Sequence, residues 1–93
     1  MGAAHIEPYA EVGKRLVKLA QAANLSGISI SRLTENRIRP SRWTEYTQGK
    51  RQITVEAAID LCRITGATLD YIYRGDESGL PKRLIEAFGF RAA

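Results

Sequence analysis

The sequence predicts an all-helical fold, in which five short helices form a bundle and a short sixth helix follows at the C-terminal end. Apolar residues recur at the three- and four-residue spacing of amphipathic helices along most of the chain. Residues that cap helix starts and glycines that end helices divide this pattern into short segments. Residues 28–31 alternate as a strand would, but the chain offers no second strand to pair with them. The 93 residues are enough for one domain with one modest core.

The first two helices are expected over residues 7–24 and 29–36. In the second helix, Ser29 is the expected N-cap, and Ile30 and Leu33 are expected to face the core. The buried stripe of the first helix is expected to contain Tyr9, Val12, Leu16, Leu19, Ala20 and Ala23.

The third helix is expected to begin at Pro40, because a proline fits the first helical turn, and to end at Gly49. Trp43 is its expected inward anchor, and Tyr46 lies three positions further on. The polar and basic residues of this segment are left to face outward.

The fourth helix is expected to follow the cap residue Thr54, to run to about Thr65 and to end at Gly66. A short fifth helix is expected over residues 69–73, between its cap Thr68 and the closing Gly75. The expected buried side of the fourth helix contains Val55, Ala58, Ile59 and Cys62.

The last helix is expected over about residues 80–89 and follows a bundle that covers about residues 7–75. Its apolar residues have two interpretations, packing on the core or forming the interface of a homodimer, and the homodimer is favoured. Two domains related by a two-fold axis read half-sites about one helical turn apart. The residues assigned to this interface are Leu80, Leu84, Ile85 and Phe88.

The formal net charge of +4 is concentrated in one segment of the chain. Residues 32–51 carry six basic and two acidic side chains, whereas the remaining residues carry eight of each sign. A charge run is usually a solvated helix face with its own ion-pair partners. Because the acidic partners are missing from this segment, a polyanion is the expected partner.

The composition argues against several other classes of protein. The single cysteine, Cys62, rules out an internal disulfide, and with one histidine the chain has no four-ligand zinc site. No apolar stretch has membrane-spanning length, and no signal segment opens the chain. We therefore expect a cytoplasmic protein of bacterial or phage origin, with no membrane partner, no small-molecule ligand and no cofactor. Most carboxylates have cap or surface roles, and nothing in the sequence suggests a pocket around them, so an enzyme is not expected.

Residues 42–51, RWTEYTQGKR, resemble the recognition helix and following loop of Cro and lambda-repressor-type domains, the XRE family. Residues 53–58 and 66–75 resemble the fourth and fifth helices of this family, and the SGLP run at residues 78–81 also recurs in its bacterial members. The resemblance covers roughly residues 10–81. It implies a lambda-repressor-like helix-turn-helix domain that binds duplex DNA and regulates transcription, most often as a repressor.

The resemblance also implies roles for the side chains around the third helix, which would enter the major groove. Arg42 can bond guanine O6 and N7 together, and Glu45 is expected either to accept from cytosine or to hold Arg42 in place. The residues expected to face base edges are Ser41, Arg42, Thr44 and Glu45. The residues expected to contact phosphates are Ser29, Arg37, Arg39, Gln48, Lys50 and Arg51.

The second helix and the turn after it depart from the family pattern. Family members usually start this helix with a glutamine that clamps the DNA backbone, whereas this region contains Gly27, Ile28 and Ser29. The stretch from residue 25 to residue 43 is longer than in the family, and Thr47 stands where glutamate is usual. These departures support an alternative function, a protein-interaction module or antitoxin-type partner with the same fold and reduced DNA binding.

Overall fold

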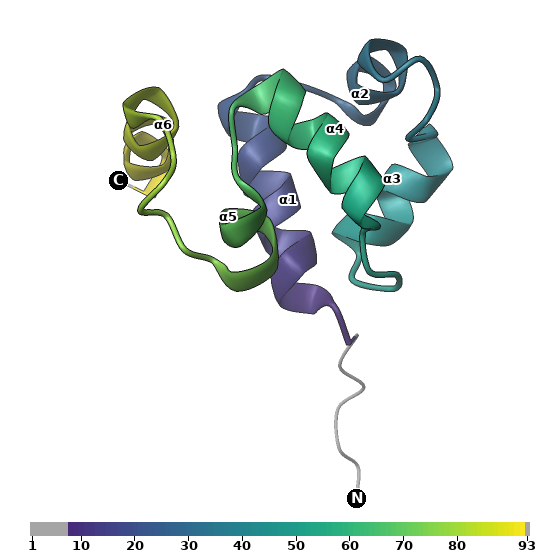
Figure 1. The fold of residues 1–93 in the computed structure, drawn as a ribbon, viewed down its shortest axis with the longest axis horizontal. Coiled ribbons are helices and arrows are strands. Elements are labelled where there is room, and N and C mark those ends of the chain that lie inside the picture. The colour runs from purple at the N-terminus through teal and green to yellow at the C-terminus, as the bar shows by residue number, and fades with distance from the viewer. Residues whose placement is uncertain (1–7, 93) are drawn as a thin grey trace, which may run out of the picture.

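A computed structural model describes residues 8–92 of the chain, and the side chains of residues 8–89 within them. This part of the chain is all-helical and contains no strand (Figure 1). None of the described helices is long and apolar enough to cross a membrane. The helices are α1 (Ala10–Ala22), α2 (Gly27–Leu33), α3 (Pro40–Thr47), α4 (Val55–Thr65), α5 (Leu69–Arg74) and α6 (Lys82–Ala92).

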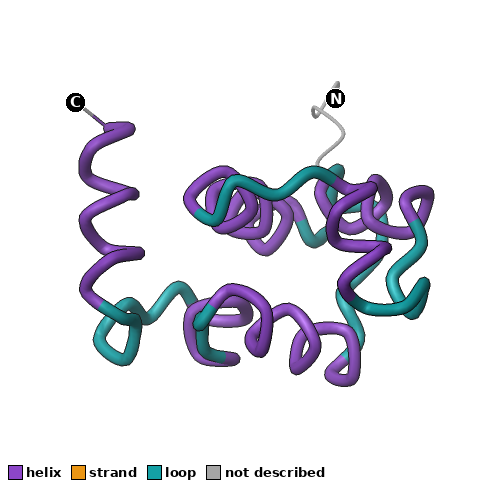
Figure 2. Tube along the Cα trace, turned by 90° about the horizontal axis from the view of Figure 1, so that it is seen from above, coloured by secondary structure: helices purple, strands orange, loops and turns teal. Residues whose placement is uncertain are grey.

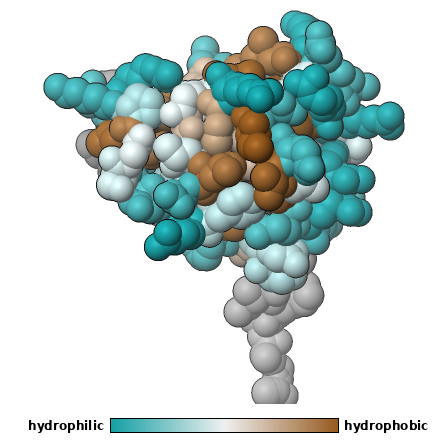
Figure 3. Space-filling view, viewed as in Figure 1, coloured by the Kyte–Doolittle hydropathy of each residue, from teal (hydrophilic) through white to brown (hydrophobic). Residues whose placement is uncertain are grey.

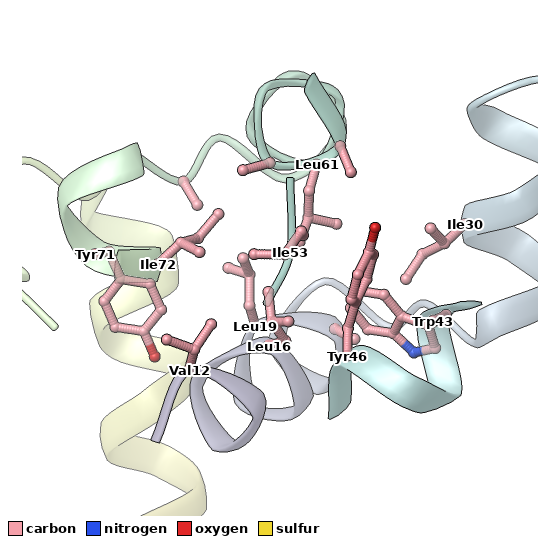
Figure 4. Close-up of a cluster of buried hydrophobic side chains, with 14 of the residues drawn as sticks. Val12, Leu16, Leu19, Ile30, Trp43, Tyr46, Ile53, Leu61, Tyr71 and Ile72 are labelled. Atoms are coloured by element: carbon pink, nitrogen blue, oxygen red, sulfur yellow. The ribbon is translucent and has the colours of Figure 1, made fainter. Parts of the chain in front are cut away.

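The central element of the fold is α1, which packs against α3, α5 and α6. Its Leu16 and Leu19 side chains are fully buried, and Figure 4 shows Ile53 and Ile72 reaching toward them from other parts of the chain. Arg15 of α1 donates to two carbonyls in the last turn of α5, at 3.0 and 3.2 Å. These contacts join α1 to α5 through both the core and the surface.

The helices around α1 are distributed along the molecule. Figure 1 and Figure 2 both place α2 and α3 at one end and α6 at the opposite end. The short helices α2 and α3 pack against each other, and α3 also packs on α1. The side of α3 that faces away from α1 is therefore free of α6.

The local signals for α3, α4 and α5 are confirmed. α3 begins at Pro40, as predicted, and ends at Thr47, before Gly49. The predicted caps Thr54 and Thr68 each accept a hydrogen bond from the backbone N–H three residues further on, at 3.1 and 3.0 Å. Glycines in the left-handed region follow α4 and α5 directly, at the two predicted positions, Gly66 and Gly75.

The prediction for α2 was wrong at both ends. Ser26 is the N-cap, and its hydroxyl oxygen accepts from the N–H of Ser29 at 3.1 Å, so Ser29 lies inside the first turn. Ile30 is fully buried, as predicted, but Leu33 is 54% exposed. Ile30 is therefore the one large side chain of α2 that is buried in the core.

Other expected core positions were also wrong. Val55 and Ile59 lie four residues apart on one side of α4 and are exposed, and Tyr9, which precedes α1, is exposed as well. The expected start of the first helix at residue 7 lies outside the described residues. α4 instead buries a side that contains two alanines, which let the helix backbone lie close to its neighbours. The apolar residues on this buried side are Ala57, Ala58 and Leu61.

The last helix packs on the core of its own chain. Leu84 and Phe88 are buried against the rest of the molecule, and α6 contacts α1. The Phe88 ring stacks on Tyr71 with 5.4 Å between ring centroids, and the Lys18 ammonium lies 4.7 Å from the Phe88 centroid. Because Leu80 is buried as well, core packing accounts for three of the four residues assigned to a dimer interface.

Only Ile85 of that assigned set is exposed. α6 also runs to Ala92, beyond the expected end at about residue 89. The predicted dimer surface is therefore corrected: Leu80, Leu84 and Phe88 pack on the core of their own chain.

The α1–α3 contact predicts an unusual sensitivity at Gly13. A Cβ atom there would lie 2.6 Å from the carbonyl oxygen of Thr47 and 2.9 Å from that of Tyr46. We expect Gly13→Ala to lower the free energy of unfolding by about 1–3 kcal/mol, because two helix backbones must separate. Gly89→Ala is the control, since a Cβ at Gly89 meets nothing within 4 Å. Urea unfolding followed by circular dichroism measures both, and equal stability of the two variants would contradict the contact.

Candidate nucleic-acid interface

The inner side of α3 anchors the helix in the core. Trp43 and Tyr46 are both buried, and Figure 4 shows the two rings side by side, with Ile30 of α2 beyond them. A Cβ atom at Gly27 would lie 3.0 Å from Cδ1 of Trp43. The indole therefore occupies space beside the start of α2, where a longer side chain at position 27 meets the ring.

The turn between α2 and α3, residues 34–39, is held by its own polar groups. The hydroxyl of the buried Thr34 donates to the carbonyl of Ile30 at 2.8 Å and accepts from the N–H of Ile38 at 3.2 Å. Glu35 and Asn36 adopt left-handed backbone angles, with φ of 54° and 66°. Asparagine tolerates this region better than most residues, and two successive residues there reverse the chain within a short distance.

The outer side of α3 presents the residues predicted to face base edges. Ser41 and Thr44 are exposed, Glu45 is half-buried and Gln48 is exposed, and these four positions repeat at the spacing of one helix face. Arg42 extends from the neighbouring position. The Thr44 hydroxyl donates to the carbonyl of Pro40 at 3.1 Å, so part of its hydrogen-bonding capacity is used within the helix.

Glu45 is paired with two arginines at once. Nε of Arg51 donates to Glu45 Oε1 at 3.1 Å, and Nε of Arg42 lies 3.0 Å from the same oxygen. All three side chains are between 42% and 52% exposed. The structure thus brings Glu45 to Arg42, one of the two roles expected for it, and adds Arg51, which the sequence analysis assigned to phosphates alone.

Arg37 forms an ion pair that the sequence analysis missed. Its Nε and Nη2 atoms donate to the two carboxylate oxygens of Asp60 in α4, at 2.9 and 3.1 Å. The hydrogen bond from Arg37 lowers the pKa of Asp60 and raises that of Arg37. Arg37 also lies 3.5 Å from Glu35. The guanidinium thus ties the 34–39 turn to α4, and its predicted contact with a phosphate stays a prediction.

Asp60 is buried, unlike most carboxylates of the chain, for which cap or surface positions were expected. Its partner lies twenty-three residues earlier in the chain, so spacing within α4 could not identify the pair. The only signal was its position three residues after Ala57, on the side of α4 that faces inward.

The remaining predicted phosphate contacts differ in whether their side chains already have a partner within the described residues. Arg39 and Lys50 are exposed, and their side chains make no ion pair or hydrogen bond with the residues that the structure describes. Gln48 is exposed as well. The Ser29 hydroxyl lies 3.0 Å from that of Ser26, so it is engaged at the start of α2. Among the predicted phosphate contacts, Arg39 and Lys50 are therefore the cations most available to a partner.

An open groove of about 540 Å³ separates the start of α3 from the start of α4. Three arginines and two carboxylates line it, which leaves the lining with a positive balance. Its walls are formed by Arg37, Arg39, Ser41, Arg42, Tyr46, Thr54, Glu56, Ala57 and Asp60. The groove is lined by residues of the N-terminal turn of α3 and of the 34–39 turn before it.

The described residues hold neither a metal-binding cluster nor an activated thiol. No group of three or more His, Cys, Asp or Glu side chains within them could hold a metal ion. Cys62 is partly buried, and this burial raises the pKa of its thiol. The thiol is therefore protonated near neutral pH and is a poor nucleophile.

Comparison of the chain with protein-family models, with curated proteins and with solved structures gives no significant match. The class of protein is therefore defined by the fold and the surface described above. The chain is an all-helical protein with a polar and basic surface along the outer side of α3.

The Arg37–Asp60 pair predicts acid-sensitive stability. The pKa of Asp60 is lower in the folded state, so the pair contributes fully above the unfolded value of about 3.9 and is lost as the pH falls through the folded value. Asp60→Asn is expected to lower the free energy of unfolding at pH 7 by roughly 1 kcal/mol, since the arginine side of the pair remains exposed.

The measurement is urea unfolding of wild type and Asp60→Asn between pH 7 and pH 3. The difference between the two proteins should shrink as the pH falls. Asp70→Asn is the control, because its ion pair with Arg74 is exposed and 3.7 Å long. A difference that stays constant with pH would contradict the contribution of the ionised pair.

Proposed function

We propose that this protein binds duplex DNA sequence-specifically and regulates transcription, with α3 inserted into the major groove. The observation that carries this proposal is the two-sided character of α3. Its inner side is anchored by Trp43 and Tyr46, and its outer side presents polar side chains together with Arg42. Further basic residues, Arg39, Lys50 and Arg51, flank the helix. An α-helix with its side chains is about 10–12 Å in diameter, which fits the major groove of about 12 Å.

We further propose that α2, the 34–39 turn and α3 form a helix-turn-helix within a lambda-repressor-like bundle of the XRE family. Support comes from the packing of α2 on α3 and from the caps and glycines that delimit α4 and α5. The 34–39 turn is longer than the usual three to four residues of this motif. The Arg37–Asp60 pair compensates for this length, because it fixes the turn to α4.

In this proposal the positively charged residues have two roles, contact with phosphates and contact with a base. Arg39 and Lys50 contact phosphates and supply affinity with little sequence preference. Arg42 contacts a guanine through its outward-facing nitrogen atoms, which are free of hydrogen bonds to described residues. Ser41 and Thr44 lie beside Arg42 and complete the surface that faces the bases.

We also propose that two copies bind an inverted repeat, because one helix of this length reads few base pairs. The two-fold contact cannot use Leu80, Leu84 or Phe88, which are buried in the protomer. The spacing of the half-sites on DNA is therefore the direct measure of how the copies are arranged.

The alternative function is a protein-interaction module or antitoxin-type partner with reduced DNA binding. Two observations favour it: Arg37, Arg42 and Arg51 are paired with carboxylates of their own chain, and Ile28 and Leu33 leave apolar surface on α2. The exposed and unpaired Arg39 and Lys50 favour DNA.

Selection of binding sites from randomised duplex DNA at about physiological salt separates the two functions, because non-specific binding is weak there. DNA binding predicts enrichment of an inverted repeat. Folded protein that enriches no sequence would favour the interaction module and would contradict DNA recognition.

Substitution of single arginines tests these separate roles, by comparing the affinity of each variant for the selected duplex and for a scrambled duplex. Arg42→Ala is expected to weaken binding to the selected duplex by about tenfold or more, with a smaller effect on the scrambled one. Arg39→Ala is expected to weaken binding to both equally and to reduce the slope of log K against log salt by about 0.9.

Lys82→Ala is the matched control, because it removes one positive charge from α6 at the opposite end of the molecule. Fluorescence anisotropy over a salt series measures all three variants. Equal losses on both duplexes for Arg42→Ala would contradict its role in reading a base.

A further inference from the structure

Glu45 is the only carboxylate on the outer side of α3, and one of its oxygens is shared between two guanidinium groups. Nε of Arg42 and Nε of Arg51 lie 3.0 and 3.1 Å from Oε1. Arg51 belongs to the loop after α3, so Glu45 joins the recognition surface to that loop. The arrangement places two positive charges close together with one negative charge between them.

The shared contact determines which edge of each arginine remains free. Only Nε of each guanidinium is in contact with Glu45, and the terminal edge formed by Nη1 and Nη2 makes no hydrogen bond with the described residues. Those terminal nitrogens form the planar fork that binds a guanine edge or a phosphate. An arginine held by one edge loses less conformational freedom when its other edge binds.

The charge balance at this point also matters. Two like charges this close repel each other unless a carboxylate lies between them. Without Glu45 the arginines would separate, and each could reach whichever phosphate lies nearest. With Glu45 in place the three side chains carry a net charge of one rather than two, which weakens binding that depends on phosphates alone.

We propose that Glu45 is a positioning residue that sets the sequence specificity of this surface, an inference that rests on the proposed DNA binding. It holds Arg42 with its terminal nitrogens toward the bases, and it restrains Arg51 from acting as an independent phosphate contact. Glu45 thus lowers the affinity for DNA of any sequence and raises the ratio of specific to non-specific affinity.

The test compares Glu45→Gln with wild type on the selected and scrambled duplexes over a salt series. The variant is expected to bind scrambled DNA more tightly, with the slope of log K against log salt steeper by about one. The ratio of selected to scrambled affinity is expected to fall about tenfold, the discrimination of one well-placed arginine. Thermal unfolding of the variant establishes that the fold is retained.

Glu35→Gln is the matched control, because it removes the same charge from the segment of residues 32–51 without touching Arg42 or Arg51. Its partner Arg37 remains bound to Asp60. We expect this variant to keep the discrimination of wild type. A similar loss in Glu35→Gln would mean that net charge alone is responsible and would overturn the proposal.

Two further outcomes are decisive. Unchanged discrimination in Glu45→Gln would overturn the positioning role. A changed preference at a single base pair, with unaltered affinity for scrambled DNA, would mean that Glu45 accepts from a base itself, and this also overturns the proposal. Wild-type protein is measured first, and a lack of discrimination there would refute DNA recognition rather than the role of Glu45.

Discussion

The seating of α3 depends on the close approach of its backbone to α1 at Gly13. The absence of a side chain there leaves room for the carbonyl oxygens of Tyr46 and Thr47. Because the two helices lie this close, Trp43 and Tyr46 enter the core, and the opposite side of the helix must face solvent. The candidate interface is therefore a consequence of helix packing, and Gly27 makes the same accommodation for the Trp43 ring at the start of α2.

The basic segment of residues 32–51 has fewer unpaired cations than its composition indicates, because two carboxylates, Asp60 and Glu45, bind three of its arginines. Burial separates the roles of these carboxylates. Asp60 is buried, so separating it from Arg37 would leave a poorly solvated charge, and the pair belongs to the structure. Glu45 is 42% exposed, and a pair at the surface is weak enough to rearrange against a phosphate or a base. The Arg37–Asp60 pair fixes the 34–39 turn, whereas the pairs of Glu45 with Arg42 and Arg51 can rearrange at the surface.

Local signals predicted much of the fold, whereas choices made by tertiary contacts could not be predicted. Thr54 and Thr68 were identified because an N-cap bonds only to its own first turn. Ser26 and Ser29 both fit a cap, and the start of α2 depends on how Ile30 meets the core. The exposure of Ser41 and Thr44 was predicted, because it follows from one helix face. A contact was missed where the partner is distant in sequence, as for Arg37 and Asp60.

The burial of α6 bears on how specificity can arise. Phe88 covers Tyr71, and Leu84 is buried, so among the side chains of α6 that the structure describes Ile85 is the one large apolar residue left exposed. If DNA is read as proposed, the eight residues of α3 make few base contacts, and each must discriminate well. An exposed arginine with free rotation discriminates poorly, since it can satisfy its donors on phosphates anywhere along the duplex. A carboxylate that fixes Arg42 and Arg51 by one edge removes this freedom, and specificity in so small an interface then depends on restraint as much as on contact.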